Sequence, residues 1–132
     1  MADALGPIVN SLSEPFYAAG ADDRLVLPHC VTTDRPFWPP SPSSPFVTAG
    51  PVEWRQVDPT GEVRAIVTFA RVFQQALADR MPFAIALVEL AGGVRLHAHA
   101  ADPQSLAAGD RARLTFVRLA PDLPPVLHAE RA

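Results

Sequence analysis

The chain has 132 residues, of which 48% are hydrophobic, and a formal net charge of −3 at pH 7. This length supports one compact domain with a small appended element, and the apolar content excludes wholesale disorder. Every basic residue is arginine, and scattered arginines on an acidic chain exclude the continuous basic face that a nucleic-acid binder needs.

The sequence also lacks the marks of export or membrane insertion. Its longest apolar run, residues 84–90, is too short to cross a membrane, and no basic start followed by an apolar block opens the chain. The single cysteine, Cys30, cannot build a disulfide framework. We therefore expect a cytoplasmic protein with neither a membrane nor a nucleic acid as its partner.

Residues 1–27 are predicted to form an N-terminal helical arm. The segment Ser13–Gly20 has a proline near its first turn and ends in glycine, a pattern typical of a short helix. So short a helix is stable only if Phe16 and Tyr17 dock on another part of the protein. A short strand is expected to follow over Arg24–Leu27.

Residues 28–51 are rich in proline and serine. Proline removes a backbone donor and fixes φ, so we expect neither a helix nor a central strand in this segment. Flexible linkers rarely carry three aromatic residues, yet this segment contains Phe37, Trp38 and Phe46. The prediction is an ordered, irregular loop held by aromatic packing.

Residues 52–132 are predicted to be β-rich. Strand-forming segments occur at 52–57, 63–72, 82–90, 94–100 and 111–119, and residues 126 and 127 could close the sheet. Gly92 and Gly93 supply a hairpin turn, and residues 102–109 resemble a short capped helix. About five strands with one short helix match a small closed barrel of the OB type.

Short motifs along the chain occur in an order typical of one family. They are His29–Cys30, Pro39–Ser41, Ser44–Val47, Gly61–Val63, Arg71–Phe73, Pro82–Leu90, Asp102–Pro103 and Gly109. In this order the sequence resembles the domain of unknown function 35 family, in which a helical arm and a zinc ribbon precede an OB-fold barrel. The resemblance implies a protein that handles acyl-CoA and acts as a small partner of thiolase-like enzymes.

The resemblance also implies the fold class and the division of the chain. We expect an all-β (mainly β) protein, a five-stranded OB-fold barrel with an N-terminal helical arm and a rubredoxin-like zinc-ribbon remnant lacking its cysteines. The arm covers residues 1–27, the remnant 28–51 and the barrel 52–132.

Four positions correspond to the zinc ligands of the family, and only one of them is a cysteine. Cys30 and Thr33 stand where the first Cys-x-x-Cys pair would be, and Ser44 and Val47 where the second would be. A hydroxyl is a poor zinc ligand and an aliphatic side chain is none. We therefore expect no zinc and no other cofactor, with acyl-CoA as the one candidate ligand.

One candidate surface for binding a ligand or a partner is the run Phe37, Trp38, Pro39 and Pro40. Exposed apolar residues of this kind mark interaction sites, so the run could pack on a partner or line an acyl channel. It could equally replace the missing ion in stabilising the remnant, because a small lobe without metal needs another source of stability.

A second candidate is the pair Arg71 and Phe73, at a strand end where the family usually reads His-Arg-Pro-Phe. An arginine there could bind a CoA phosphate by a forked, charge-assisted hydrogen bond. It could equally pair with Glu89 or Asp79 on a solvated surface.

No catalytic residue is predicted. His97 and His99 lie two apart on a strand and so face the same way, as two metal ligands or a proton relay would, but no third ligand is close in sequence. Cys30 is expected to be a relic or a small packed residue, because a catalytic thiol would also need a nearby base and an electropositive pocket. No Ser-His-Asp order, phosphate-binding glycine loop or dinucleotide fingerprint occurs.

The function that the resemblance implies is that of a non-catalytic, acyl-CoA-binding accessory subunit in lipid metabolism. It would dock on a thiolase-like or enoyl-CoA-hydratase-like enzyme, and a homodimer is the default oligomer. Two alternatives stay open. One is a nucleic-acid-binding OB module, and the other is a stand-alone acyl-CoA hydrolase using His97, His99 or Cys30.

Overall fold

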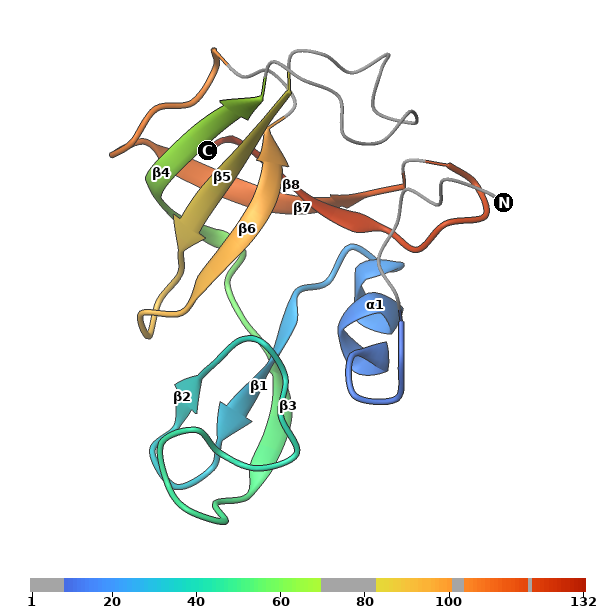
Figure 1. Cartoon of the computed structure of the whole chain (residues 1–132), viewed down its shortest axis with the longest axis vertical. Coiled ribbons are helices and arrows are strands. Elements are labelled where there is room, and N and C mark those ends of the chain that lie inside the picture. The colour runs from blue at the N-terminus through green and yellow to red at the C-terminus, as the bar shows by residue number, and fades with distance from the viewer. Residues whose placement is uncertain (1–8, 70–82, 101–103, 119) are drawn as a thin grey trace.

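A computed structural model describes residues 9–69, 83–100, 104–118 and 120–132. Within these ranges, eight strands form a closed barrel and a separate small sheet, and one short helix lies beside them (Figure 1). The elements are α1 (Glu14–Gly20), β1 (Val26–Cys30), β2 (Arg35–Pro36), β3 (Val52–Gln56), β4 (Thr60–Phe69), β5 (Phe83–Glu89), β6 (Arg95–Ala100), β7 (Arg111–Val117) and β8 (Val126–Arg131). No helix in the described ranges is long and apolar enough to cross a membrane.

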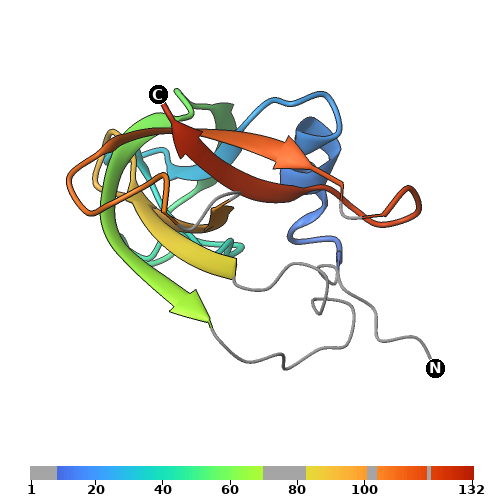
Figure 2. The ribbon, with the colours of Figure 1, turned by 90° about the horizontal axis from the view of Figure 1, so that it is seen from above.

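The barrel has the strand order β4-β5-β6-β8-β7 and closes through pairing of β4 with β7. The β6–β8 pair is parallel and the other pairs are antiparallel, so the predicted five-stranded OB barrel is confirmed. Figure 2 shows β4, β7 and β8 curving around the barrel. The core is filled by alternate, mostly small residues of the strands, among them Val63, Ala84, Ala86, Val88, Leu96, Ala98, Ala112, Leu114 and Ala129.

Strand β4 can pair with both β5 and β7 because its first residues bend across the barrel. A Cβ atom on Gly61 would lie 2.2 Å from the carbonyl oxygen of Glu89, so only glycine fits at this crossing. The register between β4 and β5 then shifts between Val63 and Ala65. Such a bulge increases the local twist that a closed barrel needs.

The second sheet, with order β2-β1-β3, belongs to a region of residues 26–56 that we call the small lobe. β1 is its central strand, and Pro28 lies within that strand, so the expectation of no central strand in residues 28–51 was wrong. The Pro28 carbonyl accepts the Phe37 N–H (3.0 Å), on the side of the short strand β2. A backbone N–H at Pro28 would point to this same side. The β1–β2 pairing ends at His29 and Pro36, so no hydrogen bond of that ladder is lost at Pro28.

Two further expectations differ from the structure. Strand β3 pairs with β1 rather than with the barrel, so residues 52–56 complete the small lobe although we expected them in the barrel. The described part of 102–109 forms turns instead of a helix. There Asp110 accepts the Ala107 N–H at its carboxylate (2.9 Å) and donates its own N–H to the Ala107 carbonyl (3.0 Å), which closes a turn.

The helical arm forms as predicted and docks on both other parts. Phe16 is 3% exposed, and Tyr17 is half-buried. At the end of α1, a Cβ atom on Gly20 would lie 2.5 Å from the Phe116 ring on β7. The Asp23 carboxylate accepts the Phe116 N–H (3.1 Å), so backbone polar groups as well as apolar surface hold the arm in place.

Candidate functional site

An aromatic cluster joins the arm, the small lobe and the barrel. Phe16 lies at its centre, with ring-centroid distances of 4.9 Å to Tyr17, 4.5 Å to Trp38 and 5.3 Å to Phe116. Helix α1 directs Phe16 inward, while Trp38 comes from the loop that follows β2. The irregular loop is therefore held by aromatic packing, as predicted, and Phe37 is buried in it as well.

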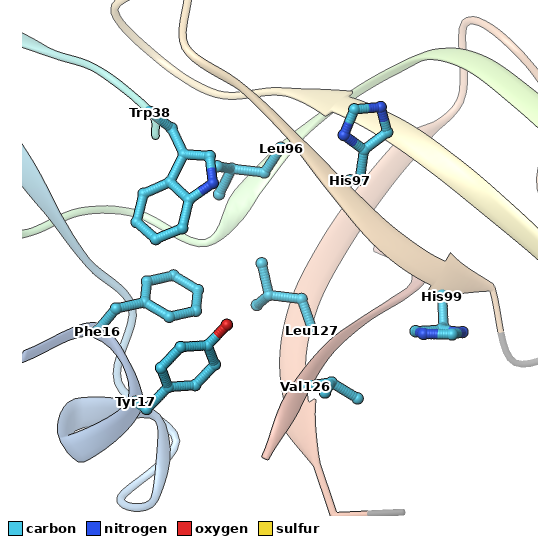
Figure 3. A pocket seen from close by; sticks show the side chains of 8 residues that line it. All are labelled: Phe16, Tyr17, Trp38, Leu96, His97, His99, Val126 and Leu127. Carbon is cyan, nitrogen blue, oxygen red and sulfur yellow. The ribbon is translucent and has the colours of Figure 1, made fainter. Parts of the chain in front are cut away.

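A small cavity lies between this cluster and the barrel, and we call it the arm cavity (Figure 3). Its volume is about 210 Å³, and it is lined by Phe16, Tyr17, Trp38, Leu96, His97, His99, Val126 and Leu127. Figure 3 shows the Tyr17 hydroxyl pointing into the space between the helix and Leu127. Burial raises the pKa of Tyr17 above its ordinary value. Because small-molecule pockets usually hold about 300–1,000 Å³, this space suits only a small group or the end of a chain.

A larger cavity, which we call the turn cavity, lies where the small lobe meets the β5–β6 turn. It has about 420 Å³ and is lined by Arg35, Pro36, Phe37, Trp38, Pro45, Phe46, Gly92, Gly93, Val94 and Arg95. The Arg35 guanidinium carbon lies 4.0 Å from the centroid of the Phe46 ring, and Arg95 pairs with Glu89 at 2.8 Å. The described lining thus combines two cations with aromatic surface and contains no carboxylate.

The predicted ligand- or partner-binding residues are only partly brought together. Phe37 and Trp38 both line the turn cavity, whereas Pro39 and Pro40 line neither cavity and Pro39 is exposed. The Trp38–Pro39 peptide bond is cis. Arg71, Phe73 and Asp79 lie outside the described residues, and Glu89 pairs with Arg95.

The outer face of β4, β5 and β6 carries an apolar surface that sequence reasoning missed. Ala65, Leu87 and His97 form one row across these strands, and Val67, Ile85 and His99 form the next. All of these residues except His99 line a shallow hollow of about 370 Å³, which we call the outer-face hollow. The parity of Ile85 and Leu87 within the 82–90 run could have revealed it, because alternate residues of a strand face opposite sides.

The predicted common orientation of His97 and His99 is correct, and a third histidine joins them. The parallel β6–β8 pairing places His99 opposite His128, and the two rings stack with 5.4 Å between centroids. Within the described ranges no three His, Cys, Asp or Glu side chains are grouped so that they could hold a metal ion.

Of the four positions at which the resemblance implies a lost zinc site, Cys30 and Thr33 are in direct contact, and so are Ser44 and Val47. The Cys30 Sγ accepts the Thr33 N–H at 3.4 Å, and hydrogen bonds from the Ser44 and Thr33 hydroxyls lower the pKa of the Cys30 thiol to about 7, against the smaller, opposite effect of burial. Cys30 has no exposed surface. The neighbouring His29 directs its Nδ1 to the Leu27 carbonyl oxygen, 2.9 Å away. One thiol, two hydroxyls and the Val47 side chain do not fit zinc, which needs four N, S or carboxylate donors.

Comparisons with known proteins agree with the architecture. Residues 54–117 match the family described as the C-terminal OB-fold domain of ChsH2. No curated protein sequence gives a match. Among solved structures, the chain is similar to one from an Ltp2–ChsH2(DUF35) aldolase, with a TM-score of 0.80 and 24% identity over 95% of this chain and 98% of that one. It is also similar to a DUF35-family protein of unknown function from Sulfolobus solfataricus, with a TM-score of 0.63 and 14% identity over 94% of this chain and 87% of that one.

Proposed function

We propose that this chain, which has the fold of DUF35 proteins and matches the ChsH2 C-terminal OB-fold family over residues 54–117, is a non-catalytic subunit that docks on a thiolase-like or hydratase-like enzyme. A solved structure with this fold belongs to an aldolase whose name joins two proteins, Ltp2 and ChsH2, which supports a role in a complex. The catalytic groups of such a complex would come from the partner.

The apolar outer face of β4–β6 is the observation that carries this proposal. Val67 is 56% exposed although it is aliphatic, and it lines the outer-face hollow together with Ile85 and Leu87. Continuous apolar surface of this kind marks interaction sites. OB folds commonly bind through the face of their second and third strands, which are β5 and β6 here.

Acyl-CoA is the ligand that we propose for the complex. The turn cavity offers Arg35 and Arg95 to a phosphate and aromatic surface to an apolar group. The arm cavity, which shares Trp38 with the turn cavity, is lined mainly by apolar side chains. Together they could contribute part of the wall of a channel for a CoA ester.

The two alternatives are less well supported by the same surfaces. A nucleic-acid-binding OB face needs cations and stacking aromatics, whereas β4–β6 present aliphatic residues and His97 in the outer-face hollow. A hydrolase would need an accessible nucleophile, and Cys30 is fully buried.

The test is affinity capture of the tagged chain from its native host, followed by mass spectrometry. Wild type should recover a thiolase-like or hydratase-like protein in near-equal amount. Val67→Asp should lose it, whereas Val117→Asp, at an exposed valine on β7 outside the hollow, should retain it. Capture of no such enzyme would contradict the proposed function, and equal capture by Val67→Asp would exclude this face as the docking surface.

A further inference from the structure

Two turns of the small lobe share one hydrogen-bonding pattern. In the first, the Asp34 N–H donates to the Cys30 carbonyl (2.8 Å) and the Thr33 N–H donates to the Cys30 Sγ (3.4 Å). In the second, the Ser44 Oγ accepts the N–H groups of Phe46 (2.9 Å) and Val47 (3.1 Å). In each turn a side-chain sulfur or oxygen accepts the amide three residues later.

The two turns are joined side by side. The backbone links them, because Val31 donates its N–H to the Pro51 carbonyl (3.0 Å). A Cβ atom on Gly50 would lie 2.9 Å from the Ser44 Cβ and 3.1 Å from the Val47 Cβ, so these two side chains flank the same glycine.

Zinc-binding turns place their ligands in a comparable way. Residues spaced as Cys-x-x-Cys reach one ion from a single turn, and amide donors around the ligands orient them. We propose that Cys30, Thr33, Ser44 and Val47 retain the arrangement of a four-ligand zinc site, in which hydrogen bonds from the backbone amides of the two turns to the Cys30 sulfur and the Ser44 oxygen take the place of the ion. The lobe therefore folds without metal, and this inference is independent of the proposed function.

Restoring the missing sulfurs tests the arrangement directly. The triple variant Thr33→Cys, Ser44→Cys, Val47→Cys should bind one Co²⁺ per chain under reducing conditions and show the visible bands of tetrahedral thiolate coordination, which Zn²⁺ then abolishes. Wild type should show neither. The matched control Thr32→Cys, Ser43→Cys, Thr48→Cys also has four cysteines in the lobe, at exposed positions one residue away, and should not give this spectrum.

Three outcomes would overturn the inference. One is a folded triple variant that gives no tetrahedral spectrum, and another is a control that gives the same spectrum. The third is wild-type protein that carries stoichiometric zinc, since the hydrogen bonds would then not replace the ion.

A second measurement applies if the triple variant does not fold. Ser44→Ala should speed amide hydrogen exchange at Phe46 and Val47 by roughly tenfold, because each amide loses its acceptor. Ser43→Ala, at an exposed neighbour, should leave both rates unchanged. Equal rates in the two variants would show that Ser44 does not hold the second turn, and would overturn the inference.

Discussion

The indole of Trp38 packs on the phenyl ring of Phe16 with 4.5 Å between ring centroids, and this contact ties the small lobe to the arm. Phe16 also meets Phe116 of β7, at 5.3 Å. Three parts of the chain that are distant in sequence thus depend on one aromatic cluster.

Replacing Trp38 by alanine should lower the free energy of unfolding by about 2–4 kcal/mol, because a large, partly buried ring is removed from the cluster. Urea denaturation followed by circular dichroism measures the change. Phe46→Ala, at a ring that is 38% exposed, is the control and should cost less than about 1 kcal/mol. A loss within about 0.5 kcal/mol for Trp38→Ala would mean that the indole does not stabilise the junction.

Gly20→Ala should destabilise the docked arm. The new Cβ would lie 2.5 Å from the Phe116 ring, and overpacking of this kind usually costs about 1–3 kcal/mol. The better helix propensity of alanine offsets up to about 1 kcal/mol of this cost, so we expect a net decrease in the free energy of unfolding. Ala18→Ser, on the exposed side of α1, should change the free energy of unfolding by less than about 0.5 kcal/mol. A stabilised Gly20→Ala protein would show that Phe116 moves aside freely.

The thiol of Cys30 should make the protein more stable as the pH rises from 7 towards 9. Its pKa is lowered from 9.0 to about 7 by the hydrogen bonds from Ser44 and Thr33. In this range the unfolded chain therefore binds more protons than the folded chain, and the free energy of unfolding increases with pH. The stabilisation is fully present above the unfolded pKa and is lost as the pH falls through the folded one.

The measurement compares urea denaturation of wild type and Cys30→Ala at several pH values from 6 to 9.5. Their difference in stability should grow with pH across this window. A flat or falling difference would contradict the lowered pKa.

Arg35→Ala should weaken binding of a CoA ester to the assembled complex by roughly tenfold to a hundredfold, the range for losing one charge-assisted hydrogen bond. Calorimetry on the complex measures the affinity. Arg64→Ala removes an exposed arginine that pairs with Glu62 outside the turn cavity, and it should bind like wild type. Equal affinities in all three proteins would remove Arg35 from the ligand site.

The barrel could be predicted from the sequence because its signals are local. Alternation marks Ala112 and Leu114 as inward residues of β7, and Gly92 and Gly93 adopt the positive φ values of a tight turn. The strand order β4-β5-β6-β8-β7 was not predicted, because local patterns cannot give it.

The rest depended on contacts between distant residues. His99 meets His128 only through the parallel β6–β8 pairing, which no spacing in the sequence reveals. Pro28 occupies a central strand because β2 ends before its missing donor would be needed. The described residues 104–109 form turns instead of the expected helix, because the Asp110 carboxylate binds the Ala107 N–H. The neighbouring Leu106 is buried in the core.

Trp38 lines both the arm cavity and the turn cavity, so a single indole forms part of the wall of each. A substitution at this position would therefore change the walls of both spaces at once. A group bound on one side would therefore influence what fits on the other. If the chain has a preference among ligands, it is set for both cavities together by the orientation of this one ring.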